Sequence, residues 1–453
     1  MAGLQKADWA GISLHRRSGV RLLQCALRES AFEGTEVCRP RIYSVAGVVA
    51  PNYLEISAPL YPLLRIGLTE KIFADRKILY FGHAPMEGAG SAVIVFRHLR
   101  RLAASGWSIS IISDWGQDLE YCDREGWPVF HLTHRKPWWP PYNPENPLLR
   151  VVRHWLWAGE CDRFLKGKRP DAVFTYLSAF TDFMSQVALA YASRYSVPLS
   201  VIAHDDPACF APTPGEGLEL RRRYQGVVER AHRTWFASPE LAAIYELPLA
   251  KRTTLPPIPE GFNACPEWKP EFAASPLLVY AGNYWPAQLP LLARIAREVA
   301  AMGGRLMLMV KASPEVHALC SVEPIVWREP FRENREALAF LAQNAAGLLV
   351  SYAESSDAMP WTRTSFPSKL IEYTHLGLPI MIYAPADSAA ANWAKDRAYA
   401  DYATPQTPGA VKEFVGSLKD RENWIRKAAF SKSFAATEFN PKRIQDKFEA
   451  ALN

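Results

Sequence analysis

The chain has 453 residues, more than one ordinary domain, so two hydrophobic cores are expected. A composition of 49% apolar and 22% charged residues is typical of a globular protein and excludes an intrinsically disordered one. The net charge of +6 fits anionic ligands or a membrane surface and is too small to indicate a nucleic-acid partner.

Cysteine usage and hydropathy indicate the compartment. The 7 cysteines are scattered and never form a C-x-x-C pair, which favours reduced thiols over a disulfide framework or a zinc site. No apolar run is long enough to span a bilayer, and residues 1–21 lack the apolar core of a signal peptide. We therefore expect a cytoplasmic protein. Residues 1–75 are predicted to be an N-terminal extension, and the sequence does not indicate its role.

The first regular pattern predicts a strand, a glycine loop, a helix and a second strand. The strands are expected at 77–82 and 108–113, the helix at 92–105, and Gly88 and Gly90 in the loop. Such a βαβ unit builds a parallel sheet. Small residues before a helix let a phosphate or a sugar approach the main chain, although a lone G-x-G is also common in tight turns.

A nicotinamide dinucleotide site is the weaker interpretation of this loop. Val93 stands where the G-x-G-x-x-G pattern has its last glycine. No acidic residue lies about twenty positions further on at a strand end; Asp114 is the nearest and closely follows the second strand, so the dinucleotide interpretation survives but is weaker.

The rest of the chain repeats this alternation of strands and helices on both sides of a proline-rich break. The break spans 248–276 and is interpreted as a linker and hinge. Further strands are predicted at 172–176, 199–203, 234–238, 277–282, 306–310, 347–351 and 380–383, and helices at 180–195, 218–232, 289–301, 333–344, 422–434 and 442–452. The prediction is an α/β fold of two Rossmann-like domains facing a cleft. Their ranges are 76–255 and 256–435, and a C-terminal helix within 436–453 returns to the first domain.

The most informative stretch is Ser365 to Ile380, which predicts a loop, a short helix and a strand. Pro367 suits the first helical turn, where free N–H groups attract phosphate. Ser368 and Lys369 add a hydroxyl and a positive charge at this end, and Glu372 lies one turn further on the same face, where its carboxylate can accept hydrogen bonds from a ribose diol. A helix start with a merely solvated Glu372 is the alternative.

This stretch resembles the nucleotide-sugar site of the group 1 glycosyltransferases, which have the two-domain GT-B architecture. In that family a P-S-K-L-x-E-Y-x-x-x-G-x-P-like sequence lies in the C-terminal domain, and its Glu, here Glu372, holds the donor ribose. Weaker similarities occur at 83–113, at the P-D-V-like stretch 170–173 and at 197–201. The resemblance implies a metal-independent, retaining sugar transferase that needs no cofactor, and the absence of any D-x-D sequence agrees with it.

The catalytic candidates follow the strand at 199–203. His204 resembles the family histidine that contacts the transferred sugar, and Asp205 can orient it or accept a proton from an acceptor hydroxyl. The alternative for this segment is a turn built by Asp206 before Pro207.

The second domain departs from the family pattern in two ways. Thr364 stands where members usually have a second Glu, and no basic residue follows Gly282 to grip the diphosphate. Lys311 is the expected substitute, helped by Arg363 or Lys369, although it also suits a solvated strand end. Tyr352 is expected to line the same donor pocket as Gly282.

The segment 131–157 is rich in aromatic and basic residues, which favour a lipid headgroup interface. A proline-stiffened loop is the alternative. Together these features predict a cytoplasmic glycosyltransferase that uses a nucleotide-sugar donor and a glycan, lipid-linked or other hydroxyl acceptor. A sugar-nucleotide epimerase of the same fold, and a relative that binds nucleotide or glycan without turnover, remain open.

Overall fold

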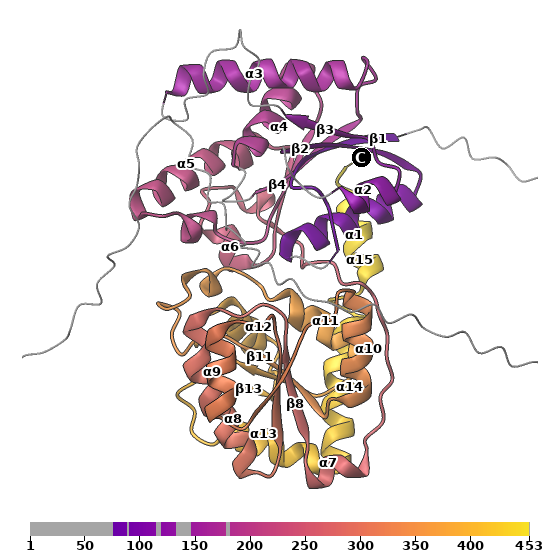
Figure 1. The fold of residues 1–453 in the computed structure, drawn as a ribbon. Coiled ribbons are helices and arrows are strands. Elements are labelled where there is room, and N and C mark those ends of the chain that lie inside the picture. The colour runs from indigo at the N-terminus through magenta and orange to yellow at the C-terminus, as the bar shows by residue number, and fades with distance from the viewer. Residues whose placement is uncertain (1–75, 88–89, 115–118, 133–145, 178–181, 453) are drawn as a thin grey trace, which may run out of the picture. The chain divides into compact units, whose positions relative to one another are not determined.

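The computed structural model describes residues 76–87, 90–114, 119–132, 146–177 and 182–452 (Figure 1). The predicted extension at 1–75, the loop glycine Gly88 and the first part of the aromatic and basic segment, at 133–145, lie outside these residues.

The N-terminal half of the described chain forms a parallel sheet of 7 strands in the order β3-β2-β1-β4-β5-β6-β7. Its strands are β1 (Arg76–Gly82), β2 (Trp107–Asp114), β3 (Val129–Leu132), β4 (Ala172–Tyr176), β5 (Leu199–Ala203), β6 (Arg233–Phe236) and β7 (Thr253–Thr254). Strands β4 and β5 are buried along their whole length, as expected when helices cover both faces of a parallel sheet.

The C-terminal half forms a second parallel sheet of 6 strands in the order β10-β9-β8-β11-β12-β13. Its strands are β8 (Leu277–Ala281), β9 (Arg305–Met309), β10 (Ile325–Arg328), β11 (Gly347–Ser351), β12 (Ile380–Tyr383) and β13 (Tyr402–Ala403). The prediction of two Rossmann-like sheets is confirmed. The strands absent from the prediction, β3, β7, β10 and β13, have only two to four residues each and lie towards the sheet edges.

Helices flank both sheets (Figure 1). Those of the first half are α1 (Gly90–Ala104), α2 (Glu120–Arg124), α3 (Pro147–Phe164), α4 (Asp182–Tyr195), α5 (Pro214–Arg230) and α6 (Pro239–Ala243). Those of the second are α7 (Pro270–Ala274), α8 (Leu289–Ala301), α9 (Pro314–Val322), α10 (Asn334–Asn344), α11 (Ser368–Leu376), α12 (Ala389–Asp396), α13 (Ala410–Lys419), α14 (Arg421–Ala436) and α15 (Pro441–Glu449).

Helix α3 corrects the alternative of a proline-stiffened loop for the residues after 146. Asn146 caps the helix, because its side chain accepts a hydrogen bond from the Leu149 N–H at 3.1 Å. Pro147 occupies the first helical position, where its missing N–H costs nothing. The prolines that suggested a loop therefore end where the helix begins.

The linker is shorter than the predicted 248–276. Thr253 and Thr254 pair with β6 and so belong to the first sheet, while Pro270 starts α7 beside the second. Between β7 and α7, residues 255–269 lack helix and strand. Its prolines remove backbone donors and stiffen the connection.

The C-terminal helix α15 packs on the first half of the chain, beside α1 (Figure 1). The Phe448 ring is fully buried, with its centroid 4.8 Å from Trp235 and 5.2 Å from Phe174. Gln445 Oε1 lies 2.8 Å from Nδ1 of the buried His98. The chain therefore crosses between the two halves twice, at the linker and again before α15.

Candidate active site

The strand order of each sheet indicates the edge at which a ligand is expected to bind. The order reverses between β1 and β4 in the first sheet and between β8 and β11 in the second. In open parallel sheets, ligands bind at the carboxyl ends of the strands beside such a reversal. The predicted residues that follow strand ends, His204 and Asp205 after β5, Gly282 after β8, Lys311 after β9 and Tyr352 after β11, therefore lie at these edges.

Helix α11 has the predicted form. Pro367 is its N-cap with φ −72° and ψ 110°, and no side chain of that residue caps the first turn. Gly377 ends the helix in the left-handed conformation, with φ 64°, which a residue with a Cβ rarely adopts. Ser368 is exposed and Pro367 is buried. The start of α11 thus presents backbone N–H groups and a hydroxyl beside the loop after β8.

Lys369 lies over that loop. Its Nζ is 4.0 Å from the centroid of the Tyr280 ring and 3.4 Å from the Asn283 carbonyl oxygen. Gly282 has φ +100°, so only glycine fits there without strain, and a Cβ at this position would lie 3.8 Å from Lys369 Nζ. The ammonium group, the bare backbone of Gly282 and the start of α11 therefore lie close together.

Lys311 is exposed directly beyond β9, the neighbour of β8. Arg363, its expected helper, instead bonds Asp357 at 2.6 Å and Asp387 at 3.0 Å. The Arg363 guanidinium is therefore ion-paired with two acidic residues.

Glu372 has partners that the sequence does not reveal. Its carboxylate is ion-paired with Arg97 of α1 and accepts hydrogen bonds from the Glu260 N–H at 3.3 and 3.4 Å. Arg97 is only 5% exposed and also donates to Glu260 Oε2 at 3.1 Å and to the Ile258 carbonyl oxygen at 3.0 Å. The carboxylate therefore joins α11 to α1 and to the linker.

This contact leaves Glu372 capacity for a ligand. An ionised carboxylate offers about four lone-pair positions. Arg97 and the Glu260 N–H donate to the carboxylate and do not fill those positions. No local pattern links residues 97, 260 and 372, so sequence reasoning could not find the group.

His204 is buried beside an aromatic ring at the end of β5. The His204 ring is 7% exposed and lies 5.3 Å from the Tyr176 ring, and none of the described residues bonds its Nδ1. Burial, followed by the charge of His98, lowers the pKa of His204 to about 3. The imidazole is therefore neutral at physiological pH, and its Nδ1 is buried.

Asp206 builds the predicted turn. Its side chain accepts a hydrogen bond from the Ala208 N–H at 3.1 Å and is ion-paired with Arg221. This fixes the short helix η1 (Pro207–Phe210) and, with it, the direction of the chain after β5.

Asp205 lies where the two halves meet. Burial raises the pKa of its carboxyl group, the nearby Ser365 hydroxyl lowers it, and the Asp206 charge raises it further. Burial raises the pKa of Tyr352, and the neighbouring Tyr280 and Asp205 raise it further. Asp205 of the first half is therefore close enough to Ser365 of the second for the hydroxyl to affect the pKa of its carboxyl group.

The first turn of α1 contributes to the same centre. Gly90 begins the helix with φ +43°, and a Cβ there would meet nothing within 4 Å. Ser91 follows it, and its side chain hydrogen-bonds Tyr176 at the end of β4. Tyr176, Tyr280, Ser91 and Arg97 were missed by sequence reasoning, since buried tyrosines and a helical arginine carry no local functional signal.

Thr364 makes a contact between the two halves through its backbone. Its carbonyl oxygen accepts a hydrogen bond from Ser238 Oγ at 2.5 Å, and its hydroxyl donates to the Trp361 carbonyl oxygen at 3.3 Å. The position supplies a backbone contact between the halves and no carboxylate.

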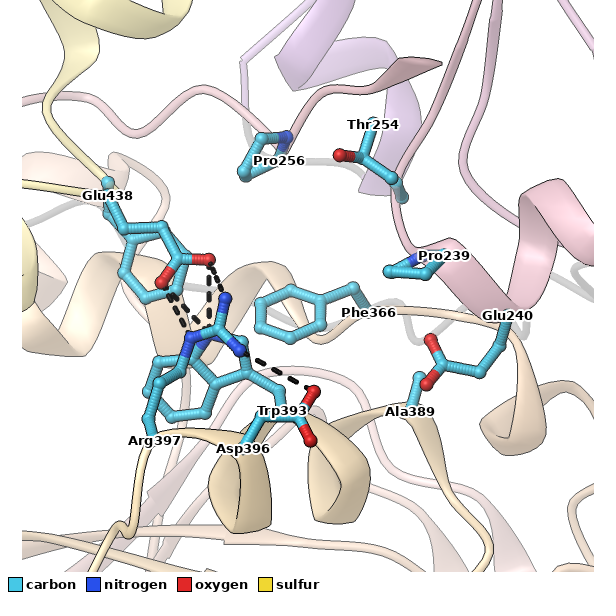
Figure 2. A pocket seen from close by; sticks show the side chains of 12 residues that line it. Pro239, Glu240, Thr254, Pro256, Phe366, Ala389, Trp393, Asp396, Arg397 and Glu438 are labelled. Atoms are coloured by element: carbon cyan, nitrogen blue, oxygen red, sulfur yellow. Dashed lines mark hydrogen bonds and ion pairs between the residues drawn. The ribbon is translucent and has the colours of Figure 1, made fainter. Parts of the chain in front are cut away.

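A separate crevice lies on the other side of the motif loop (Figure 2). Its volume is about 90 Å³, well below the several hundred Å³ of a typical ligand pocket. Arg397 and Glu438 face each other across it in a two-point ion pair at 2.7 and 2.7 Å, and the Phe366 ring of the motif points into it. Its charges satisfy one another, so we assign it to packing between the halves.

The described helices include none long and apolar enough to cross a membrane. Within the same residues no group of three His, Cys, Asp or Glu side chains is placed to hold a metal ion.

Comparison with solved structures identifies the architecture. A glycosyltransferase from Rickettsia africae superposes with a TM-score of 0.61 at 12% identity, over 84% of this chain and 98% of that one. Sucrose-phosphate synthase from Thermosynechococcus elongatus superposes with a TM-score of 0.58 at 13% identity, over 83% and 98% of the two chains. The chain has the GT-B fold.

A third structure of this fold, Anabaena HepE in complex with UDP, matches with a TM-score of 0.58 at 12% identity, over 83% of this chain and 99% of that one. No family model and no curated protein matches the sequence. At these identities the likeness establishes the architecture.

Proposed function

We propose that the protein transfers a glycosyl group from a nucleotide-diphosphate sugar to a hydroxyl acceptor. The observation that carries the proposal is the position of His204 and Asp205 at the carboxyl end of β5, in a half that contacts the motif of the second half through Arg97 with Glu372 and Ser238 Oγ with the Thr364 carbonyl oxygen. A donor held at the second sheet would therefore present its sugar to groups of the first.

The donor side uses the edge between β8 and α11. The diphosphate would bind at Gly282, Lys369 and the first turn of α11, where Ser368 adds a hydroxyl. Glu372 would accept hydrogen bonds from the ribose, and Tyr352 and Lys311 would line the remainder of the site. Anabaena HepE has been observed with UDP and with UDP-glucose, which makes uridine diphosphate sugars the first donors to test.

The acceptor side uses the ends of β4 and β5. In the transfer, the bond from the sugar C1 to the diphosphate oxygen breaks, and its electron pair leaves with the nucleotide. A bond from the acceptor oxygen to C1 forms. His204 donates to or accepts from a hydroxyl of the transferred sugar, and Asp205 accepts a hydrogen bond from the acceptor hydroxyl.

Retention of configuration and independence of metal ions are part of the proposal. Retention comes from the family resemblance, and independence of metal ions is supported by the absence of a D-x-D sequence. Under retention the acceptor proton passes to the departing diphosphate oxygen on the same face. We propose a glycan or a lipid-linked glycan as the acceptor and a hexose as the transferred sugar. Lys369 and the dipole of α11 would stabilise the charge on the departing diphosphate.

The test is release of nucleotide diphosphate from a panel of UDP-, GDP- and ADP-sugars, with His204→Ala and Glu372→Gln as variants. We expect one donor to be consumed by the wild type, His204→Ala to bind it without turnover, and Glu372→Gln to lose affinity. Donor binding by the wild type without any release or transfer would contradict an enzyme and favour the binding-only relative. The anomeric NMR signal of the first product would report retention or inversion.

A further inference from the structure

Helix α3 carries apolar side chains on two opposite faces. The inner face, with Trp157, Ala158 and Cys161, is buried in the core of the first half. The outer face exposes 71% of Leu148, 61% of Val151, 37% of Val152 and 51% of Trp155. We call these last four residues the α3 stripe.

The spacing of the α3 stripe makes it one continuous surface. Its members stand at positions i, i+3, i+4 and i+7, so their side chains lie on one side of the helix over two turns. A helix on the surface of a globular protein normally turns polar residues outward, and an exposed apolar patch of this kind marks an interaction site.

Cations border the stripe. The Arg194 guanidinium lies 3.7 Å from the centroid of the Trp155 ring and donates to the Trp155 carbonyl oxygen at 3.0 Å. The Arg163 side chain is 70% exposed near the end of the helix, and Lys168 is exposed just beyond it. The acidic Glu160 is ion-paired with Arg163 and mostly buried. Among the described residues, Arg194 is therefore the cation in contact with the α3 stripe, and Arg163 and Lys168 lie further towards and beyond the end of the helix.

We propose that the α3 stripe is a membrane-docking surface that inserts into the headgroup region of a bilayer containing anionic lipid. Amphipathic helices bind in the plane of such an interface with apolar residues inward and Lys and Arg at the edge, and tryptophan prefers this depth. Each exposed cation near the surface adds attraction to anionic headgroups.

The size of the surface favours a bilayer over a second copy of the chain. Four side chains with these exposures offer on the order of 400 Å² of apolar area, about half of the ~800 Å² that each partner buries in a standard protein interface. Docking goes beyond the transfer reaction and does not depend on it, because the stripe lies outside the candidate active site.

The experiment uses the full chain with vesicles of phosphatidylcholine alone and with 30% phosphatidylglycerol, about the anionic content at which such electrostatic binding is readily measured. The variant is Leu148→Gln with Val151→Gln and Trp155→Gln, which removes the apolar surface but keeps good helix formers. The matched control is Leu218→Gln with Leu249→Gln and Val322→Gln, which changes three hydrophobic residues exposed elsewhere, at 62%, 84% and 78%. Arg163→Gln with Lys168→Gln tests the cations.

We expect the wild type and the matched control to sediment with the anionic vesicles. The stripe variant should bind at least tenfold more weakly, and the charge variant should bind more weakly with a reduced dependence on salt. Equal binding by the stripe variant and the control, or no binding by the wild type, would overturn the proposal. So would a wild-type dimer in light scattering that only the stripe variant dissociates, because the surface would then be a self-association site. Nucleotide binding by the same proteins reports separately on the proposed transfer function.

Discussion

The Arg97–Glu372 contact makes a prediction that separates stability from ligand binding. Arg97→Met leaves the Glu372 carboxylate with the Glu260 N–H, and Glu372→Gln leaves Arg97 with Glu260 and the Ile258 carbonyl oxygen. The side chains of Arg97, Glu372 and Glu260 are 6%, 12% and 22% exposed, so the group is mostly removed from water.

The magnitude follows from this partial burial. Breaking a fully buried ion pair costs about 3–5 kcal/mol, and an exposed pair contributes about 0–1 kcal/mol. We therefore expect Arg97→Met to lower the free energy of unfolding by about 2–3 kcal/mol. Glu372→Gln keeps an acceptor for Arg97, and a loss of about 1–2 kcal/mol is expected.

The assay is urea unfolding of both single variants and of the double variant, together with nucleotide binding. A coupling energy of about 1–2 kcal/mol is expected between the two sites. Arg222→Met is the control, because this side chain is 79% exposed in its pair with Glu219 and should change stability by less than about 0.5 kcal/mol. Nucleotide binding should survive Arg97→Met and be weakened at least tenfold by Glu372→Gln. Additive effects on unfolding, or the opposite pattern of nucleotide binding, would refute the reasoning.

Three further predictions concern packing, the backbone and pH. Phe448→Ala should lower the free energy of unfolding by about 3–5 kcal/mol, because this ring is fully buried, whereas Ile425→Ala, 46% exposed, should have a much smaller effect in the same urea titration. Gly282→Ala should cost about 1–2 kcal/mol and weaken nucleotide binding, because its φ of +100° is strained for any residue with a Cβ; unchanged binding would argue against a diphosphate at this loop. Burial lowers the pKa of His98 and His204 to about 3 each and that of His154 to about 4. A histidine in the unfolded chain has a pKa of ~6.5, so below that pH the unfolded state binds more protons than the folded state. Stability should therefore fall as pH drops from 6.5 towards 4, by up to about 1.4 kcal/mol per pH unit for each histidine, and His204→Asn should reduce that slope by one proton. A urea midpoint that is unchanged between pH 7 and pH 5 would contradict the conclusion that these histidines are neutral in the folded protein.

The sheets and the motif helix could be predicted because their signals are local. Continuous apolar runs such as 199–203 and 347–351 fit strands buried on both faces, and Pro367 and Gly377 delimit α11 through backbone preferences alone. Short edge strands such as Thr253–Thr254 have no such run, and only pairing with β6 defines them.

The parts that escaped prediction depend on distant contacts. Helix α3 was obscured because its outer face is apolar, which removes the amphipathic pattern of a surface helix. Arg97 and Glu372 are separated by 275 residues, so no spacing rule connects them. The sequence allowed either a catalytic role for the segment after β5 or a turn built by Asp206. The ion pair of Asp206 with Arg221, which accounts for the burial of Asp206, could not be predicted from the sequence.

Calorimetric titration of UDP, GDP and ADP into the wild type and into Glu372→Gln tests the central claim most directly. The account predicts that one nucleotide diphosphate binds the wild type and that Glu372→Gln weakens its binding by at least tenfold, or about 1.4 kcal/mol. Binding of equal strength to both proteins, or no binding of any nucleotide to the wild type, would contradict a nucleotide-sugar site at α11.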